Sequence, residues 1–120
     1  MLPPVDRLPA PDAVLVTGGA GWLGRALVRR LAGEVAVVAT VRDDTEAASL
    51  RTALDAGMTV EIVQADVTAP DRWGHIVAKA VGRHDVVDLV HTIGVIHPGR
   101  ARDFDTVNRL GTEHVMGAAR

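Results

Sequence analysis

The chain lacks cysteine and tyrosine entirely, and Lys79 is its only lysine. The absence of cysteine excludes disulfides and thiolate chemistry, and it fits a protein of a reducing cytoplasm. Serine occurs once, as Ser49 within a predicted helix, so no serine nucleophile stands at a strand-to-helix turn. Three aromatic residues, two Trp and one Phe, make up the whole aromatic content.

Neither sign of charge is in large excess, since the formal net charge of the 120 residues is −2. No basic cluster or cationic amphipathic helix is present, so the sequence indicates neither a nucleic-acid partner nor a membrane surface. Residues 1–12 contain four prolines and no apolar stretch, which is unlike a secretory signal. We expect 1–12 to be a flexible leader and 13–120 to be one domain.

Short apolar runs alternate with helical patterns from Ala13 onward. Strands are predicted at 13–17, 34–41, 58–67 and 85–93, and helices at 22–32, 44–57, 69–82 and 101–120, with a loop at 94–100. This order predicts an α/β fold, a doubly wound parallel sheet of about four strands in the order 3-2-1-4 with helices on both faces. In the first helix, apolar residues at helical spacing predict the buried face: Trp22, Leu23, Ala26, Leu27 and Leu31.

Four glycines, Gly18, Gly19, Gly21 and Gly24, separate the first strand from the first helix. A turn of this kind needs backbone conformations and close approaches that a Cβ would block. The free N–H groups and the dipole at the start of the helix then suit an anion such as a pyrophosphate. Because a strand precedes the glycines and a helix and strand follow them, the context of a dinucleotide-binding motif is complete.

The same stretch, "TGGAGWLG", resembles the T-G-x-x-G-x-x-G fingerprint of the short-chain dehydrogenase/reductase superfamily, and its extended branch most of all. "ATVRDD", "QADVT", "DLVHTIGVIHP" and "FDTVNRLGTEHVMGAA" are similar to later segments of that branch, in the same order. The resemblance covers nearly all of Ala13 to Arg120. It implies a Rossmann domain that binds NAD(P), and it implies these cofactor-binding residues: Gly18, Gly21, Trp22, Leu23, Gly24, Arg42, Asp66, Val67, Thr92, Ile93, Gly94 and Asn108.

The second strand ends without the carboxylate that usually accepts from the ribose 2′-OH of NAD. By the resemblance Val41 stands at that position and Arg42 follows, and a guanidinium can hold a 2′-phosphate. We therefore favour NADP(H) over NAD, although Asp43 and Asp44 lie near enough in sequence to take the ribose hydroxyl instead.

Two of the carried-over positions have a second interpretation, and a third differs from the family's usual residue. Asp66 would contact adenine by analogy, or it forms a turn at a strand end. Ile93 is bulkier than the residue usual in the family and would crowd the nicotinamide ribose. Asn108 matches the asparagine that supports a proton-relay water in some relatives, or it satisfies local backbone.

The family's chemistry uses the Tyr and Lys of a Y-x-x-x-K motif, and neither can be carried over to this sequence. The resemblance therefore covers the cofactor-binding half of an oxidoreductase or epimerase that moves a hydride between nicotinamide and a carbon bearing a hydroxyl. We expect no catalytic residue and no metal site, because the five histidines show no ligand spacing. The alternatives are a non-enzymatic nucleotide-sensing or interaction module and a remnant that no longer binds nucleotide.

The fourth strand would form an open edge of the predicted sheet. Exposed edges invite pairing with another chain. The last helix would add apolar residues next to that edge. We therefore expect a protein partner or self-association through this edge and the last helix.

Overall fold

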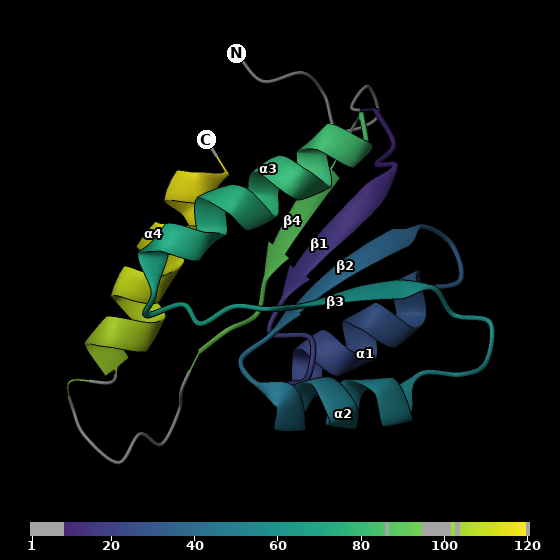
Figure 1. The fold of residues 1–120 in the computed structure, drawn as a ribbon, viewed down its shortest axis with the longest axis horizontal. Helices are drawn as coiled ribbons and strands as arrows, with labels where there is room; N and C mark the ends of the chain where they lie inside the picture. Colours follow the sequence, from purple (N-terminus) through teal and green to yellow (C-terminus); the bar gives the residue numbers. More distant parts are fainter. Residues whose placement is uncertain (1–8, 86, 95–101, 103, 120) are drawn as a thin grey trace.

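Strands and helices alternate along the part of the chain that the structure, a computed structural model, describes: residues 9–85, 87–94, 102 and 104–119. Figure 1 shows a twisted sheet between two pairs of helices. The strands are β1 (Ala13–Thr17), β2 (Ala36–Val41), β3 (Val60–Gln64) and β4 (Val87–His91). The helices are α1 (Trp22–Leu31), α2 (Asp44–Ala53), α3 (Trp73–Arg83) and α4 (Gly111–Ala118), with a 3-10 turn η2 (Pro70–Arg72) before α3 and a π-helical segment η3 (Phe104–Leu110) before α4.

The sheet confirms the predicted order, since its strands run β3-β2-β1-β4 and every pair is parallel. β1 lies in the interior, and all five of its residues are buried, as expected for a strand covered on both faces. Its last residue, Thr17, pairs with His91 of β4. The carboxyl ends of all four strands therefore meet at one edge, where ligands of doubly wound folds bind.

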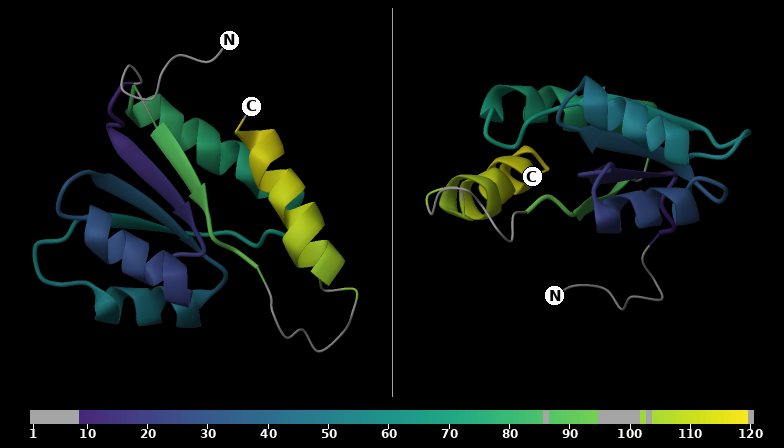
Figure 2. Two further views of the ribbon diagram at one scale, coloured as in Figure 1. Left: turned by 180° about the vertical axis from the view of Figure 1, so that it is seen from behind. Right: turned by 90° about the horizontal axis from the view of Figure 1, so that it is seen from below.

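Each face of the sheet has its own hydrophobic core. On one face Val14 and Val16 pack with Val28 of α1 and Leu50 of α2. On the other face Leu15 and Val38 pack with residues of α3 and α4, chiefly Trp73, Ile76, Ala80 and Val115. Figure 2 shows the two helix pairs separated by the sheet. The predicted helices on both faces are therefore confirmed.

The predicted buried face of α1 is wrong by about one residue. Trp22, Leu23 and Ala26 are exposed, and the buried positions are Gly24 and Val28. Leu27 and Leu31 of the predicted face do pack against the core. Two overlapping sets of residues at helical spacing could form the buried face of this helix. Because Gly24 packs against the glycine turn, the set that contains Val28 is the buried one.

Several element ends differ from the prediction. α2 stops at Ala53, so Gly57 does not cap it; its φ of +92° lies in a turn in which Met58 N donates to Asp55 O. The last helix begins as a π-helical segment rather than a regular α-helix. The predicted leader lies largely outside the described residues, as does most of the loop at 94–100.

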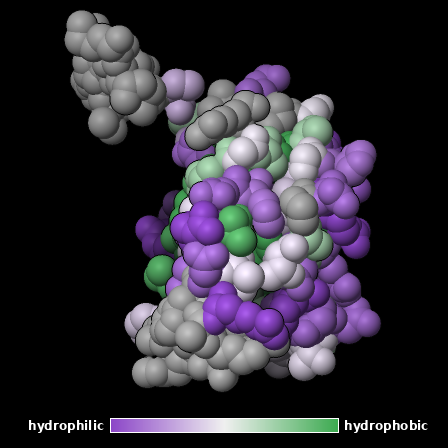
Figure 3. Space-filling view, turned by 90° about the vertical axis from the view of Figure 1, so that its left-hand side faces the viewer, coloured by the Kyte–Doolittle hydropathy of each residue, from purple (hydrophilic) through white to green (hydrophobic). Residues whose placement is uncertain are grey.

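The β4 edge and the last helix, α4, were predicted to take part in association with another chain. Where residues are coloured in Figure 3, hydrophilic and hydrophobic ones are interspersed on the visible face, without one continuous hydrophobic area. Among the described helices, none has the length and apolar content needed to cross a membrane.

Candidate functional site

The glycine turn packs so tightly that side chains are excluded from it. Gly18 has a φ of +75°, and a Cβ there would lie 2.8 Å from Thr92 Oγ1. A Cβ on Gly24 would lie only 2.0 Å from Gly18 O and 2.9 Å from the same threonine oxygen. Gly18 and Gly24 are therefore needed for the shape of the turn, one for its conformation and one for its packing.

Thr40, at the end of β2, fixes the start of this turn. Its buried hydroxyl accepts from Gly18 N at 3.3 Å, and its carbonyl accepts from Gly19 N at 2.8 Å. Gly21 N donates to Gly18 O at 3.1 Å, which folds the chain back toward α1. The first N–H groups of the turn are thus used to hold the backbone in place.

The N–H groups at the start of α1, in contrast, have no hydrogen-bond partner within the helix. Arg25 N makes the first helical hydrogen bond, to Gly21 O, so Trp22, Leu23 and Gly24 have no helical partner for their N–H groups. Within α1, all of which is described, no side chain caps the helix and the first turn carries no acid. The Trp22 side chain is 93% exposed, so it is the backbone of Trp22 and Leu23, and not their side chains, that can contribute to an anion site.

A cleft of about 510 Å³ runs along the carboxyl edge of the sheet beside this turn. Its volume is in the range of small-molecule and cofactor sites. Eight of the residues predicted from the sequence line it: Gly18, Gly21, Arg42, Asp66, Val67, Thr92, Ile93 and Gly94.

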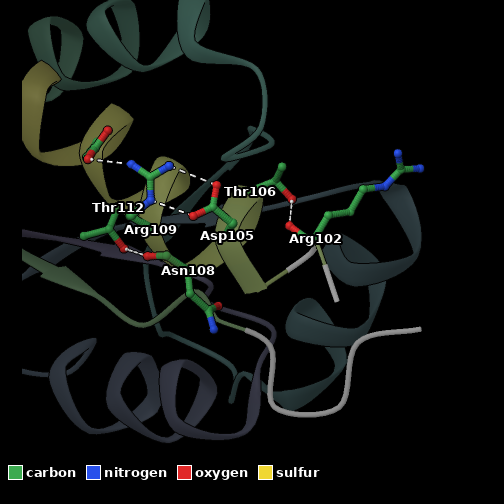
Figure 4. A network of polar contacts seen from close by, with 7 residues as sticks. Arg102, Asp105, Thr106, Asn108, Arg109 and Thr112 are labelled. Atoms are coloured by element: carbon green, nitrogen blue, oxygen red, sulfur yellow. Dashed lines mark hydrogen bonds and ion pairs between the residues drawn. The ribbon is translucent and has the colours of Figure 1, made fainter. Parts of the chain in front are cut away.

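Four predicted residues lie outside the lining of the cleft: Trp22, Leu23, Gly24 and Asn108. Gly24 is buried beneath the turn. Asn108 lies next to Gly94, its Oδ1 being 3.3 Å from the position a Cβ would take there. Figure 4 shows the Asn108 side chain pointing away from the Arg109 guanidinium, which pairs with Asp105 and Glu113 on the exposed side of η3 and α4.

The acids near Arg42 are not arranged as the sequence suggested. Asp43 caps α2, its Oδ1 accepting from Glu46 N at 2.9 Å, and Asp44 accepts from Gln64 Nε2. Of these acids near Arg42, it is Glu46 that reaches the cleft, and the sequence analysis missed it. An Asp followed three residues later by Glu is a capping-box spacing, and that signal could have placed Glu46 beside the strand end.

Asp66 forms a turn, one of its two predicted interpretations. Its Oδ1 accepts from both Thr68 N at 2.8 Å and Thr68 Oγ1 at 2.7 Å, and its carbonyl accepts from Trp73 Nε1 at 3.0 Å. Since Asp66 also lines the cleft, the turn and a contact with a ligand are compatible.

Ile93 and Val107 contribute apolar surface to the same cleft. Ile93 also packs against the glycine turn, because its Cγ1 lies 3.0 Å from the position a Cβ would take on Gly18. The larger side chain is thus accommodated by the glycine opposite it, and whether it crowds a ribose stays a prediction.

A chain of hydrogen bonds through His91 connects β1 to α4. Thr112 Oγ1 donates to Asn108 O at 2.6 Å, so it accepts from His91 Nε2 at 3.1 Å. His91 Nδ1 is then the acceptor for Thr17 Oγ1 at 2.7 Å, and Thr17 Oγ1 accepts in turn from Thr92 N at 3.1 Å. Every hydroxyl in this chain is used once as a donor when His91 is neutral with its proton on Nε2.

The free energy of unfolding should therefore fall in acid because of His91. Burial lowers the pKa of His91 below its ordinary value of 6.5, so the folded chain binds fewer protons than the unfolded chain. The stability that His91 contributes is complete above pH 6.5 and is lost as the pH falls toward its folded pKa. Urea denaturation at several pH values should show a shallower acid loss for His91→Gln than for the wild type. The exposed His75 gives the matched control, and an equal change in slope for His75→Gln would contradict this assignment.

Arg25 is a further residue that the sequence analysis missed. Its NH2 group donates to Ala20 O at 3.1 Å and to Ser49 Oγ at 2.6 Å, so it ties the glycine turn to α2. Thr17 and Thr40, both fully buried, are the polar residues within β1 and β2 near their carboxyl ends. Threonine near the ligand-binding end of a buried strand was the available sequence signal for those two residues.

Known proteins resemble the chain in both sequence and structure. The family model described as short chain dehydrogenase matches residues 12–116. The 3-beta-hydroxysteroid dehydrogenase of Comamonas testosteroni is 35% identical over 108 residues, covering 85% of this chain and 42% of that protein. The chain spans less than half the length of the curated relatives it matches.

Solved structures share the fold. A short-chain type dehydrogenase/reductase from Mycobacterium ulcerans superposes with a TM-score of 0.75 at 23% identity, covering 90% of this chain and 45% of that one. A metagenomic short-chain oxidoreductase in complex with NADP gives a TM-score of 0.73 at 23% identity, with 89% and 54% covered.

Proposed function

The chain belongs to the short-chain dehydrogenase/reductase family, and on that premise we propose that it binds a nicotinamide dinucleotide in the cleft beside the glycine turn. The observation that carries this proposal is the start of α1: N–H groups without helical partners, no acid in the first turn, and glycines that let an anion approach the backbone. The pyrophosphate would lie on the N–H groups of Trp22 and Leu23.

The remaining cleft residues support an orientation for the dinucleotide. The adenosine would lie toward the ends of β2 and β3, where Arg42, Asp66 and Val67 line the cleft. The nicotinamide would lie toward the end of β4, near Thr92, Ile93 and Gly94, with Asn108 beside Gly94. When bound, the nicotinamide supplies the hydride-transfer chemistry.

We propose that NADP(H) is preferred over NAD(H) through Arg42. Val41 and Arg42 stand where a ribose-binding carboxylate is usual, and a guanidinium can pair with a 2′-phosphate. The metagenomic relative whose structure contains NADP supports a phosphorylated cofactor for the family, although the preference itself rests on Arg42.

The 120 residues alone should bind dinucleotide without catalysing hydride transfer, because they contain no tyrosine and their single lysine, Lys79, lies in α3. The family match favours an oxidoreductase domain over a non-enzymatic sensing module. Membership of the extended branch, a place in the cytoplasm, and association through the β4 edge and α4 stay predictions.

Titration with NADPH and NADH tests the proposed function. Energy transfer from Trp22 and Trp73 to the reduced nicotinamide should saturate with either nucleotide, and with NADPH at the lower concentration. Trp22→Phe and Trp73→Phe separate the two donors. A chain shown by circular dichroism to be folded that binds neither nucleotide would overturn the proposal.

A further inference from the structure

A cluster of three charged side chains lies at the end of β2. The Arg42 guanidinium is 67% exposed and lies between two carboxylates, with Nε 3.6 Å from Asp43 Oδ2 and NH2 3.8 Å from Glu46 Oε2. Glu46 Oε1 also accepts from Arg42 N at 2.7 Å. Glu46 therefore contacts both the backbone and the side chain of Arg42, one turn ahead of it on α2.

The two carboxylates have different tasks. Asp43 Oδ1 caps α2 by accepting from Glu46 N, so this carboxylate is held at the helix start. Asp43 is not among the residues that line the cleft, whereas Arg42 and Glu46 both line it. A ligand in the cleft would therefore meet the guanidinium of Arg42 together with the carboxylate of Glu46.

The charges of this cluster oppose a phosphorylated ligand. One guanidinium and two carboxylates carry a formal net charge of −1, and a 2′-phosphate adds about −1.5 to −2 near neutral pH. When Arg42 pairs with that phosphate, the Glu46 carboxylate, 3.8 Å from the Arg42 NH2 group, stays close to the phosphate as well. A ribose 2′-hydroxyl has no such cost, and a carboxylate can accept its hydrogen bond.

We propose that Glu46 is a specificity-determining residue of the cofactor site, whose carboxylate holds Arg42 and weakens binding of a 2′-phosphorylated dinucleotide relative to its 2′-hydroxyl counterpart. This inference rests on the proposed function. It means that Arg42 and Glu46 act in opposite directions, so the wild-type preference for NADP(H) is smaller than Arg42 alone would give.

The test compares the dissociation constants of NADPH and NADH in the wild type and in Glu46→Gln. The glutamine keeps an amide oxygen that can accept from Arg42 N, so the substitution removes the charge with little change of shape. The ratio of the NADH constant to the NADPH constant should rise by about fivefold or more, the effect expected for one unit charge at short range in water. Raising the salt concentration should reduce this change.

Two further variants separate the outcomes. Glu34→Gln removes the acid of another i,i+4 pair, with Arg30, away from the cleft, and it should leave the ratio unchanged. In an Arg42→Gln background, Glu46→Gln should change the ratio less than in the wild type, because part of its effect acts through Arg42. If the wild type binds nucleotide and Glu46→Gln leaves the ratio unchanged, this inference fails alone. If the folded wild type binds neither nucleotide, the proposed function fails and this inference fails with it.

Discussion

Gly24→Ala should destabilise the fold by about 3 kcal/mol, the upper end of the usual cost of overpacking, and abolish detectable dinucleotide binding. The added Cβ would meet Gly18 O at 2.0 Å, a distance at which the backbone itself must move, and it would also lie 2.9 Å from Thr92 Oγ1. That carbonyl also accepts from Gly21 N, so moving it disturbs the whole turn. Urea denaturation and the NADPH titration measure the two effects on one preparation.

Gly82→Ala is the matched control for this prediction. Gly82 lies inside α3, and nothing in the described part of the chain comes within 4 Å of the Cβ it would gain. Gly82 is the penultimate residue of α3, where alanine gains less over glycine than the value of about 1 kcal/mol for a helix interior, so this variant should be as stable as the wild type or slightly more so. Binding of NADPH by Gly24→Ala with wild-type affinity would show that the turn can rearrange, and the steric argument would fail.

The architecture was predictable because two periodicities alternate without interruption from Ala13 onward. Apolar runs such as 13–17 match β1 to the residue, and the glycine cluster correctly marked the passage from β1 to α1. The parallel direction of the strands was predicted from the alternation of strands and helices, since right-handed crossovers through helices leave few possible topologies. These features depend on local sequence, which explains why they could be predicted.

Features that depend on tertiary contact were missed. The buried face of α1 is set by the packing of Gly24 against Gly18 O. Apolar periodicity along the helix carries no information about this contact, because both residues are glycines. The π-helical start of the last helix has no signal that we recognise in "FDTVNRL". Asp43 was expected near the ribose, but its carboxylate caps α2, and Glu46, to which the sequence analysis gave no role, lies at the cleft instead.

In the candidate site, too, some residues were predicted from the sequence and others were missed. Most of the cleft residues were implied by the family resemblance, and they lie together because strand ends of a parallel sheet share one edge. Arg25 was missed because it holds the glycine turn from α1, and no motif records such a supporting contact. Thr40 holds the turn from β2, and its only sequence signal was a threonine near a strand end. Residues that line the cleft were thus easier to predict here than residues such as Arg25 that hold the glycine turn in place.

Trp73→Ala should cost about 3–5 kcal/mol of the free energy of unfolding, the range found for large aromatic residues truncated in a core. Trp73 is fully buried and packs in the cluster that joins β1, β2 and α3. Its indole N–H also donates to Asp66 O, so the loss reaches the wall of the cleft. NADPH binding should therefore weaken as well, when measured under conditions in which the variant is still folded.

Two further variants, Trp73→Phe and Trp22→Ala, separate the loss of core packing from the loss of the indole hydrogen bond and from the effect of replacing an exposed tryptophan. Phenylalanine keeps most of the packing, and Asp66 O still accepts from Ala69 N at 3.0 Å, so the loss should be only about 1–2 kcal/mol. Trp22 is almost fully exposed, and its replacement by alanine should change the stability by no more than about 0.5 kcal/mol. Urea denaturation followed by circular dichroism measures all three variants without depending on the altered fluorophores. Equal losses for Trp22→Ala and Trp73→Ala would contradict the placement of Trp73 in the core and, with it, the support it gives to the Asp66 turn.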